Sequence, residues 1–153
     1  MRTIVKGLFA LIIACGLTFS FTAPARGEDS IVYLETIAGF CGSYLLTSYG
    51  YIATTADAYA KDLYPAGQVK FMMENTISNL TSVAGHLQRV KATNIAESDK
   101  KFVDSVLEVL DVLKLEAESL AAVTSSKNQA DVEKFDQASE QAWQKIKKLL
   151  KIN

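Results

Sequence analysis

The stretch VKFMMENTISNLTSVAGHLQRV, residues 69–90, decides the fold class of this chain. Its mostly apolar seam positions are separated by alternating steps of four and three residues, which is typical of a helix packed in a bundle. These positions are Val69, Met73, Thr76, Leu80, Val83, Leu87 and Val90. A half-buried strand would instead alternate at every second residue. The stretch therefore predicts a long helix with one buried stripe.

Three further segments with helical periodicity surround this stretch, and short breaks separate them. Pro65 ends the first segment because proline disfavours helix in the residue before it, and Ser98 is a candidate N-cap for the third. We predict helices over residues 30–63, 66–92, 99–124 and 129–151. Short connections make consecutive helices antiparallel. The predicted fold class is all-α, an antiparallel up-down-up-down four-helix bundle after an N-terminal signal peptide.

The first 25 residues have the features of a secretory signal. Arg2 and Lys6 form a basic start, residues 7–22 carry no charge, and Ala23-Pro24-Ala25 supplies the small residues that a signal peptidase recognises. We expect residues 1–25 to be removed and residues 26–153 to form the bundle domain of an exported protein, in a bacterial periplasm. Cleavage after Gly27 is a close variant. In the alternative, residues 12–15 resemble a lipoprotein box, and Cys15 would be the lipidated anchor.

Charge and cysteine content narrow the possible functions. Without Arg2 and Lys6, 14 basic residues stand against 17 acidic ones, so the chain lacks the positive balance typical of a nucleic-acid binder. Cys41 is the only cysteine outside the signal, so no disulfide can form within the mature chain. We expect Cys41 to be buried, as free cysteines often are.

The sequence also lacks the usual residues of catalysis and cofactor binding. His86 is the only histidine, which excludes the histidine-based triads in any credible form. No Glu-x-x-His pair, zinc spacing, P-loop or dinucleotide-binding glycine motif occurs. We therefore predict a non-enzymatic protein with no cofactor and no metal site.

Aromatic side chains gather on one side of the first predicted helix. All six tyrosines lie between residues 33 and 64, and at 100° per residue Tyr33, Tyr44 and Tyr51 share a direction with Phe40 beside them. The simpler interpretation is that this stripe is the core face of the helix. The alternative is that Tyr33, Phe40, Tyr44 and Tyr51 line a pocket for a small apolar ligand.

Another side of the same helix is made of small, uncharged residues. This small-residue face consists of Gly39, Gly42, Leu46, Gly50 and Ala53. Glycine inside a helix costs about 1 kcal/mol relative to alanine, so three of them need a reason. Small residues let a second helix approach closely, which favours a contact with a partner protein or a second copy of the chain. Coverage by neighbouring helices of the bundle explains the face equally well.

Two readings of function follow from these patterns. The leading one is an exported, non-enzymatic bundle that acts by protein contact or self-association through the small-residue face. The second is a periplasmic bundle that binds or senses a small ligand in a tyrosine-lined pocket. The C-terminal lysines Lys145, Lys147, Lys148 and Lys151 complement a helix dipole, and peripheral membrane contact is a lesser alternative for them.

Overall fold

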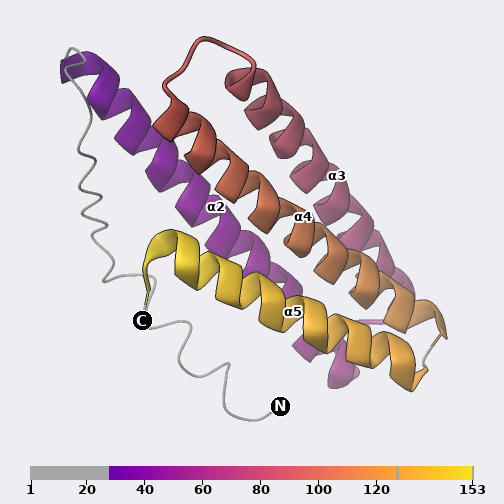
Figure 1. The fold of residues 1–153 in the computed structure, drawn as a ribbon. Coiled ribbons are helices and arrows are strands. Elements are labelled where there is room, and N and C mark those ends of the chain that lie inside the picture. Colours follow the sequence, from indigo (N-terminus) through magenta and orange to yellow (C-terminus); the bar gives the residue numbers. More distant parts are fainter. Residues whose placement is uncertain (1–27, 127, 153) are drawn as a thin grey trace. The chain divides into compact units, whose positions relative to one another are not determined.

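The computed structural model describes residues 28–126 and 128–152, with side chains described from residue 36 onward. Within these residues the chain forms four α-helices and no strand (Figure 1). The helices are α2 (Glu28–Ala60), α3 (Ala66–Lys91), α4 (Glu97–Ser126) and α5 (Gln129–Leu150). The all-helical prediction is confirmed. The predicted signal peptide, its cleavage site and Cys15 lie outside the described residues.

The chain divides into two units, residues 1–43 and residues 44–153. In the second unit, α4 packs against both α3 and α5 (Figure 1). Lys91, at the end of α3, pairs with Asp104 near the start of α4, and Lys145 near the end of α5 pairs with Glu108 of α4 at 3.0 Å. These three consecutive helices therefore alternate in direction. The described part of the first unit is the first half of α2.

Residues at steps of three and four line the buried sides of α3, α4 and α5. In α4, Val103, Val106, Leu110, Leu113, Ala117 and Leu120 have this spacing and are all buried. In α3, the first four predicted positions and Leu87 are buried, whereas Val90 is exposed near the helix end. In α5, Phe135, Ala142 and Ile146 are buried. The core of this unit is thus built on both sides of α4.

The α2–α3 connection depends on a residue in a left-handed conformation. Helix α2 ends at Ala60, before the predicted end at residue 63. Asp62 has φ 56°, and the N–H of Leu63 donates to the carbonyl of Ala58 at 2.9 Å. A six-residue closure of this type satisfies a carbonyl that the helix end leaves free. Pro65 then directly precedes α3.

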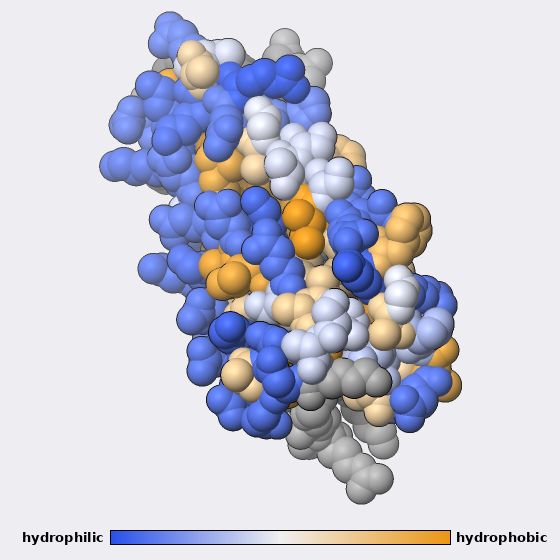
Figure 2. Space-filling model, turned by 90° about the vertical axis from the view of Figure 1, so that its right-hand side faces the viewer, coloured by the Kyte–Doolittle hydropathy of each residue, from blue (hydrophilic) through white to orange (hydrophobic). Residues whose placement is uncertain are grey.

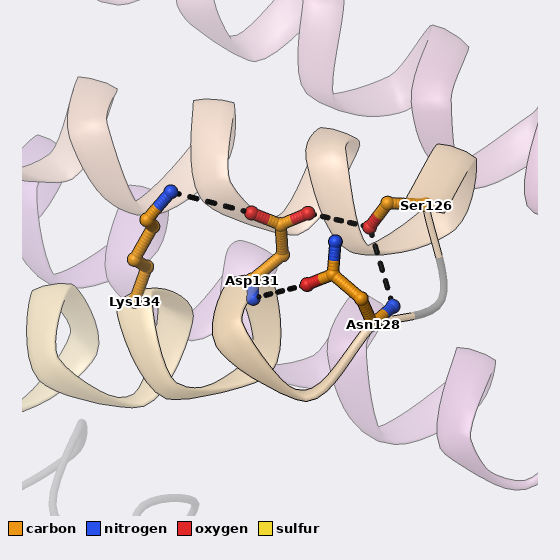
Figure 3. Close-up of polar contacts among 4 residues, drawn as sticks. All are labelled: Ser126, Asn128, Asp131 and Lys134. Carbon is orange, nitrogen blue, oxygen red and sulfur yellow. Dashed lines mark hydrogen bonds and ion pairs between the residues drawn. The ribbon is translucent and has the colours of Figure 1, made fainter.

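The two later helix starts differ in how well the sequence predicts them. Helix α4 begins at Glu97, so Ser98 lies inside the helix and the prediction of Ser98 as N-cap is wrong. Helix α5 is capped by Asn128, whose side chain accepts a hydrogen bond from the N–H of Asp131 at 2.8 Å. The Asp131 carboxylate in turn accepts from the Ser126 hydroxyl and pairs with Lys134 (Figure 3). These contacts tie the end of α4 to the first turn of α5.

Candidate functional site

The most unusual residue of the described chain is Glu116, a glutamate in the seam of α4. Val109, Leu113, Glu116 and Leu120 follow one another at steps of four, three and four residues, so they share one face of the helix. All four are buried, and Glu116 has no exposed surface at all. Acidic side chains are almost never fully buried without a partner, so this position needs a physical account.

Neither carboxylate oxygen of Glu116 has a hydrogen-bond partner, although both are buried. Burial removes the water that would stabilise the charged form, and it raises the pKa of Glu116 from 4.5 to about 8. The hydroxyl of Ser139, on α5, acts in the opposite direction and lowers this pKa without offsetting burial. The Ser139 hydroxyl does not form a hydrogen bond of normal geometry with either oxygen. At neutral pH the side chain is therefore mainly a neutral carboxylic acid.

An aromatic pair is linked to Glu116 through Tyr49, whose pKa responds to the charge of Glu116. Tyr49, in the second half of α2, stacks on Trp143 of α5 with ring centroids 5.4 Å apart and planes inclined by 21°. Burial raises the pKa of Tyr49, Ser139 lowers it, and the negative charges of Glu116 and Glu140 raise it further. We call the buried Tyr49 and Glu116, together with the half-buried Ser139 and Trp143, the buried polar cluster. It joins α2, α4 and α5 within the second unit.

The chemistry available to the buried polar cluster is the binding and release of protons. A carboxylic acid, a phenol and a hydroxyl can each donate a hydrogen bond, and the acid changes charge near neutral pH. Two surface hollows of the second unit lie elsewhere. One, of about 270 Å³, lies between α3 and α4 and is lined by residues such as Leu80, Gly85 and Leu110. The cluster is therefore set apart from these hollows.

The second hollow lies at the connection between α2 and α3. It has a volume of about 500 Å³ and is lined by Tyr59, Ala60, Asp62, Tyr64, Pro65 and Ala66. Two large apolar side chains occur in the same part of the chain, with Leu63 68% exposed and Phe71 64% exposed. We call Tyr59, Leu63, Tyr64, Pro65 and Phe71 the turn surface. On the face that Figure 2 shows, hydrophobic side chains form small, separate areas among hydrophilic ones.

The residues of the predicted small-residue face are not equally accessible. Gly42 is buried, whereas Gly39, Leu46, Gly50 and Ala53 are half-buried. A Cβ atom added at Gly39 would meet nothing within 4 Å. Gly39 and Gly42 belong to the first unit, and the other three belong to the second. A contact through this face stays a prediction.

The predicted tyrosine stripe differs in direction from the buried side of α2. The side chain of Tyr33 lies outside the described side chains, Tyr44 is half-buried, and Tyr51 is 44% exposed. Phe40, in the first unit, is 72% exposed. The buried tyrosine is instead Tyr49, which is 6% exposed and lies about 160° around the helix from Tyr33. The pocket proposed for the stripe stays a prediction.

Sequence reasoning missed Glu116, although the chain carries a signal for it. The spacing of Asp104, Glu108, Asp111 and Glu118, at steps of four, three and seven residues, predicts the solvated side of this helix, and Glu116 is not part of that pattern. Its spacing from Val109 and Leu113 places it in the apolar seam. An acidic residue at a seam position is the pattern that identifies the site.

Other features of the described residues bear on the earlier expectations. Cys41 is half-buried, less than expected, and burial raises the pKa of its thiol. The described residues contain no cluster of three or more histidine, cysteine, aspartate or glutamate side chains suited to a metal ion. None of the described helices combines the length and the apolar character that a membrane-spanning helix requires.

Comparison with protein-family models, curated proteins and solved structures finds no match to the chain.

Proposed function

We propose that the chain is an exported, non-enzymatic helical-bundle protein that acts by binding another protein through the turn surface. In this proposal residues 1–25 are a signal peptide, residues 26–153 form an antiparallel up-down-up-down bundle, and the protein works in the bacterial periplasm. The basic start, the uncharged run and the small residues before position 26 support export. Anchoring through a lipidated Cys15 is the alternative form of the same proposal.

The observation that carries the contact is the exposure of Leu63 and Phe71. Burying one side chain of this size against a partner gains roughly 1.5–3 kcal/mol, and this gain is available only if something covers it. Tyr59, Tyr64 and Pro65 line the hollow in the same part of the chain, and aromatic side chains anchor many protein interfaces. A convex aromatic or aliphatic side chain of a partner would fit this hollow.

Self-association through α2 is the second form of the contact. Leu46, Gly50 and Ala53 are half-buried, so part of each remains accessible in the second unit. Small side chains permit close approach of another helix. Replacing Ala53 by Phe would then block a dimer, and light scattering at several concentrations would distinguish this loss from an unchanged monomer.

The turn surface is tested by site-specific photocrosslinking in cells. A photoreactive side chain at position 71 is expected to give a discrete crosslinked product, which Leu63→Ser should weaken strongly. The matched control carries the same group at the exposed Asn79, two turns further along α3. Equal crosslinking from both positions, or none from position 71, would refute a contact at the turn surface.

Export is tested on the same material. The intact mass of protein recovered from the cell envelope should correspond to residues 26–153. A chain beginning at Cys15 and carrying lipid would select the anchored form, and an uncleaved chain in the cytoplasm would refute export.

Binding of a small ligand is a second candidate function, and the buried polar cluster favours it. Buried unsatisfied acceptors such as those of Glu116 are costly, and a ligand that donates hydrogen bonds would remove this cost. A thermal screen of small amines and alcohols should then find a stabilising compound whose effect disappears in Glu116→Gln. The tyrosine stripe makes a separate prediction, in which Tyr44→Ala abolishes the stabilisation. A broad screen without any stabilising compound would refute both versions.

A further inference from the structure

The two unsatisfied oxygens of Glu116 have a consequence for the packing of α5 on α4. The neighbours of Glu116 along α4 include Leu113 and Ala117, which have no exposed surface, and Ala142 of α5 has none either. An ionised carboxylate in such a setting needs water or a positive charge, and unpaired buried charges are strongly destabilising. A protonated carboxyl carries no net charge and tolerates the same setting better. The closed packing therefore favours the protonated side chain.

The charged and titratable groups on the neighbouring elements do not neutralise Glu116. From α2, the facing titratable group is Tyr49, whose own pKa burial raises. From α5, Ser139 lowers the pKa of both side chains, and the negative charge of Glu140 raises the pKa of Tyr49. On the α3 side of α4, Asp111 and Lys114 line the surface hollow between the two helices. Burial, against the opposing effect of Ser139, is what favours a neutral carboxyl at Glu116.

We propose that Glu116 is a proton-binding site that couples pH to the packing of α5 on α4. With its proton, the carboxyl stays enclosed by α4, α5 and the second half of α2. When the proton leaves to solvent, the carboxylate draws in water, the Tyr49–Trp143 stack separates, and α5 loosens from α4. The structure thereby provides a reversible, pH-dependent change in the exposure of the inner face of α5.

The chain supplies its own reporter for this change. Trp143 is the only tryptophan, and it belongs to the buried polar cluster. The experiment is a titration of the full chain from pH 5 to pH 9, with tryptophan emission as the readout and circular dichroism as the check that the helices persist. Because the pKa of Glu116 is about 8, the wild-type emission should shift to longer wavelength with a midpoint near that pH. The shift should be absent in Glu116→Gln.

Two further variants keep the test decisive. Glu118→Gln removes an exposed carboxyl two residues along α4 and should titrate like the wild type. If Glu116→Gln does not fold, Glu116→Met replaces it, because an apolar side chain of similar size suits the site better than an unsatisfied polar one. The carboxyl carbon of Glu116 can also be followed by NMR in the unaltered chain. Its resonance should titrate with the same midpoint as the tryptophan emission.

The outcomes separate the proposal from its alternatives. Loosening is measured by hydrogen exchange of the α5 amides, corrected for the intrinsic pH dependence of exchange. Relative to Glu116→Gln, the protection factors of the wild-type α5 amides should fall by up to about tenfold for each unit of pH. Opening that releases one proton becomes more favourable by at most this factor per pH unit. A carboxyl that titrates near its ordinary pKa of 4.5 would overturn the proposal. An emission shift that persists in Glu116→Gln would also overturn it, because a group other than Glu116 would then carry the titration.

Discussion

At Glu116, one proton determines how the stability of the fold depends on pH. The pKa is about 8 in the folded chain and 4.5 in the reference state, so the folded state holds the proton more tightly. This contribution to stability is fully present below pH 4.5, declines as pH rises, and is lost once pH passes 8. The decline amounts to roughly 1.4 kcal/mol per pH unit across that window.

The variant Glu116→Gln should remove this dependence. Urea unfolding measures the free energy of unfolding. For Glu116→Gln this free energy should be close to the wild-type value at pH 5 and roughly 3 kcal/mol above it at pH 7. Glu118→Gln, at an exposed position of the same helix, should change stability by less than about 0.5 kcal/mol at both pH values. Equal effects of Glu116→Gln at pH 5 and pH 7 would exclude a raised pKa.

Asp62 is the second residue whose replacement should stabilise the chain. Its φ of 56° is a conformation that costs side chains with a Cβ atom, whereas glycine adopts it freely. We expect Asp62→Gly to raise the free energy of unfolding by about 0.5–1 kcal/mol, after allowing for the greater freedom of glycine in the unfolded chain. Thermal unfolding at pH 7 measures the gain.

Alanine at the same position is the control for the glycine variant. Asp62→Ala also removes the carboxylate but keeps the Cβ atom, so it should give no stabilisation. A gain with alanine as large as the gain with glycine would show that the charge of Asp62, rather than its backbone conformation, carries the cost.

At the scale of elements, the start of α5 depends on its cap. Asn128 satisfies the N–H of Asp131, which the first turn of the helix otherwise leaves without a partner (Figure 3). Asn128→Ala should lower the free energy of unfolding by about 1 kcal/mol, and Asn128→Asp should retain most of it. Urea unfolding followed by circular dichroism measures both. An equal loss from Gln129→Ala, the exposed next residue, would show that the effect is not capping.

The Asp131 carboxylate gives the same helix start a dependence on acid. The hydrogen bond from Ser126 is the main factor that lowers its pKa, and Lys134 and Asn128 add to this. A lowered pKa means that the contribution to stability is present above the ordinary value of 3.8 and is lost as pH falls below it. In a titration from pH 5 to pH 2, Ser126→Ala should raise the pKa of the Asp131 carboxyl, as followed by NMR. An unchanged pKa would contradict the role of Ser126.

The elements also show what sequence periodicity can and cannot predict. It predicted the four helices and most of the seam of α3, because a long apolar stripe has only one way to be buried. It did not identify the buried side of α2, which includes Ala38, Leu45, Tyr49, Ile52 and Ala56. The tyrosine stripe suggested a different core face, because Tyr33, Tyr44 and Tyr51 are large side chains that also recur on one side of the helix. The residues that are in fact buried follow the alternating steps of three and four. Glu116 was missed because charge alone does not reveal burial.

At the scale of the second unit, α4 is the helix on which the others depend. It contributes eleven buried residues, whereas α3 and α5 contribute five each. The buried polar cluster lies in the contact of α5 with α4, while the described contact of α3 with α4 includes the apolar Leu80 and Leu110. Local opening should therefore begin at α5, where the unsatisfied carboxyl makes the closed state less favourable.

This hierarchy predicts the order of hydrogen exchange in the native protein. At pH 7, the amides in the middle of α4 should exchange through global unfolding, whereas those of α5 should exchange through an opening that costs less free energy. Glu116→Gln should raise the opening free energy of α5 toward that of α4, because it removes the charge whose hydration favours opening. Ile146→Ala leaves a cavity in the same helix and should lower the opening free energy of α5 instead. For global unfolding, a change of this kind lowers the free energy by about 2–5 kcal/mol. If the amides of α4 and α5 are equally protected from exchange in the wild type, the second unit opens as one body. The buried carboxyl then lowers the stability of the whole unit and not of α5 alone.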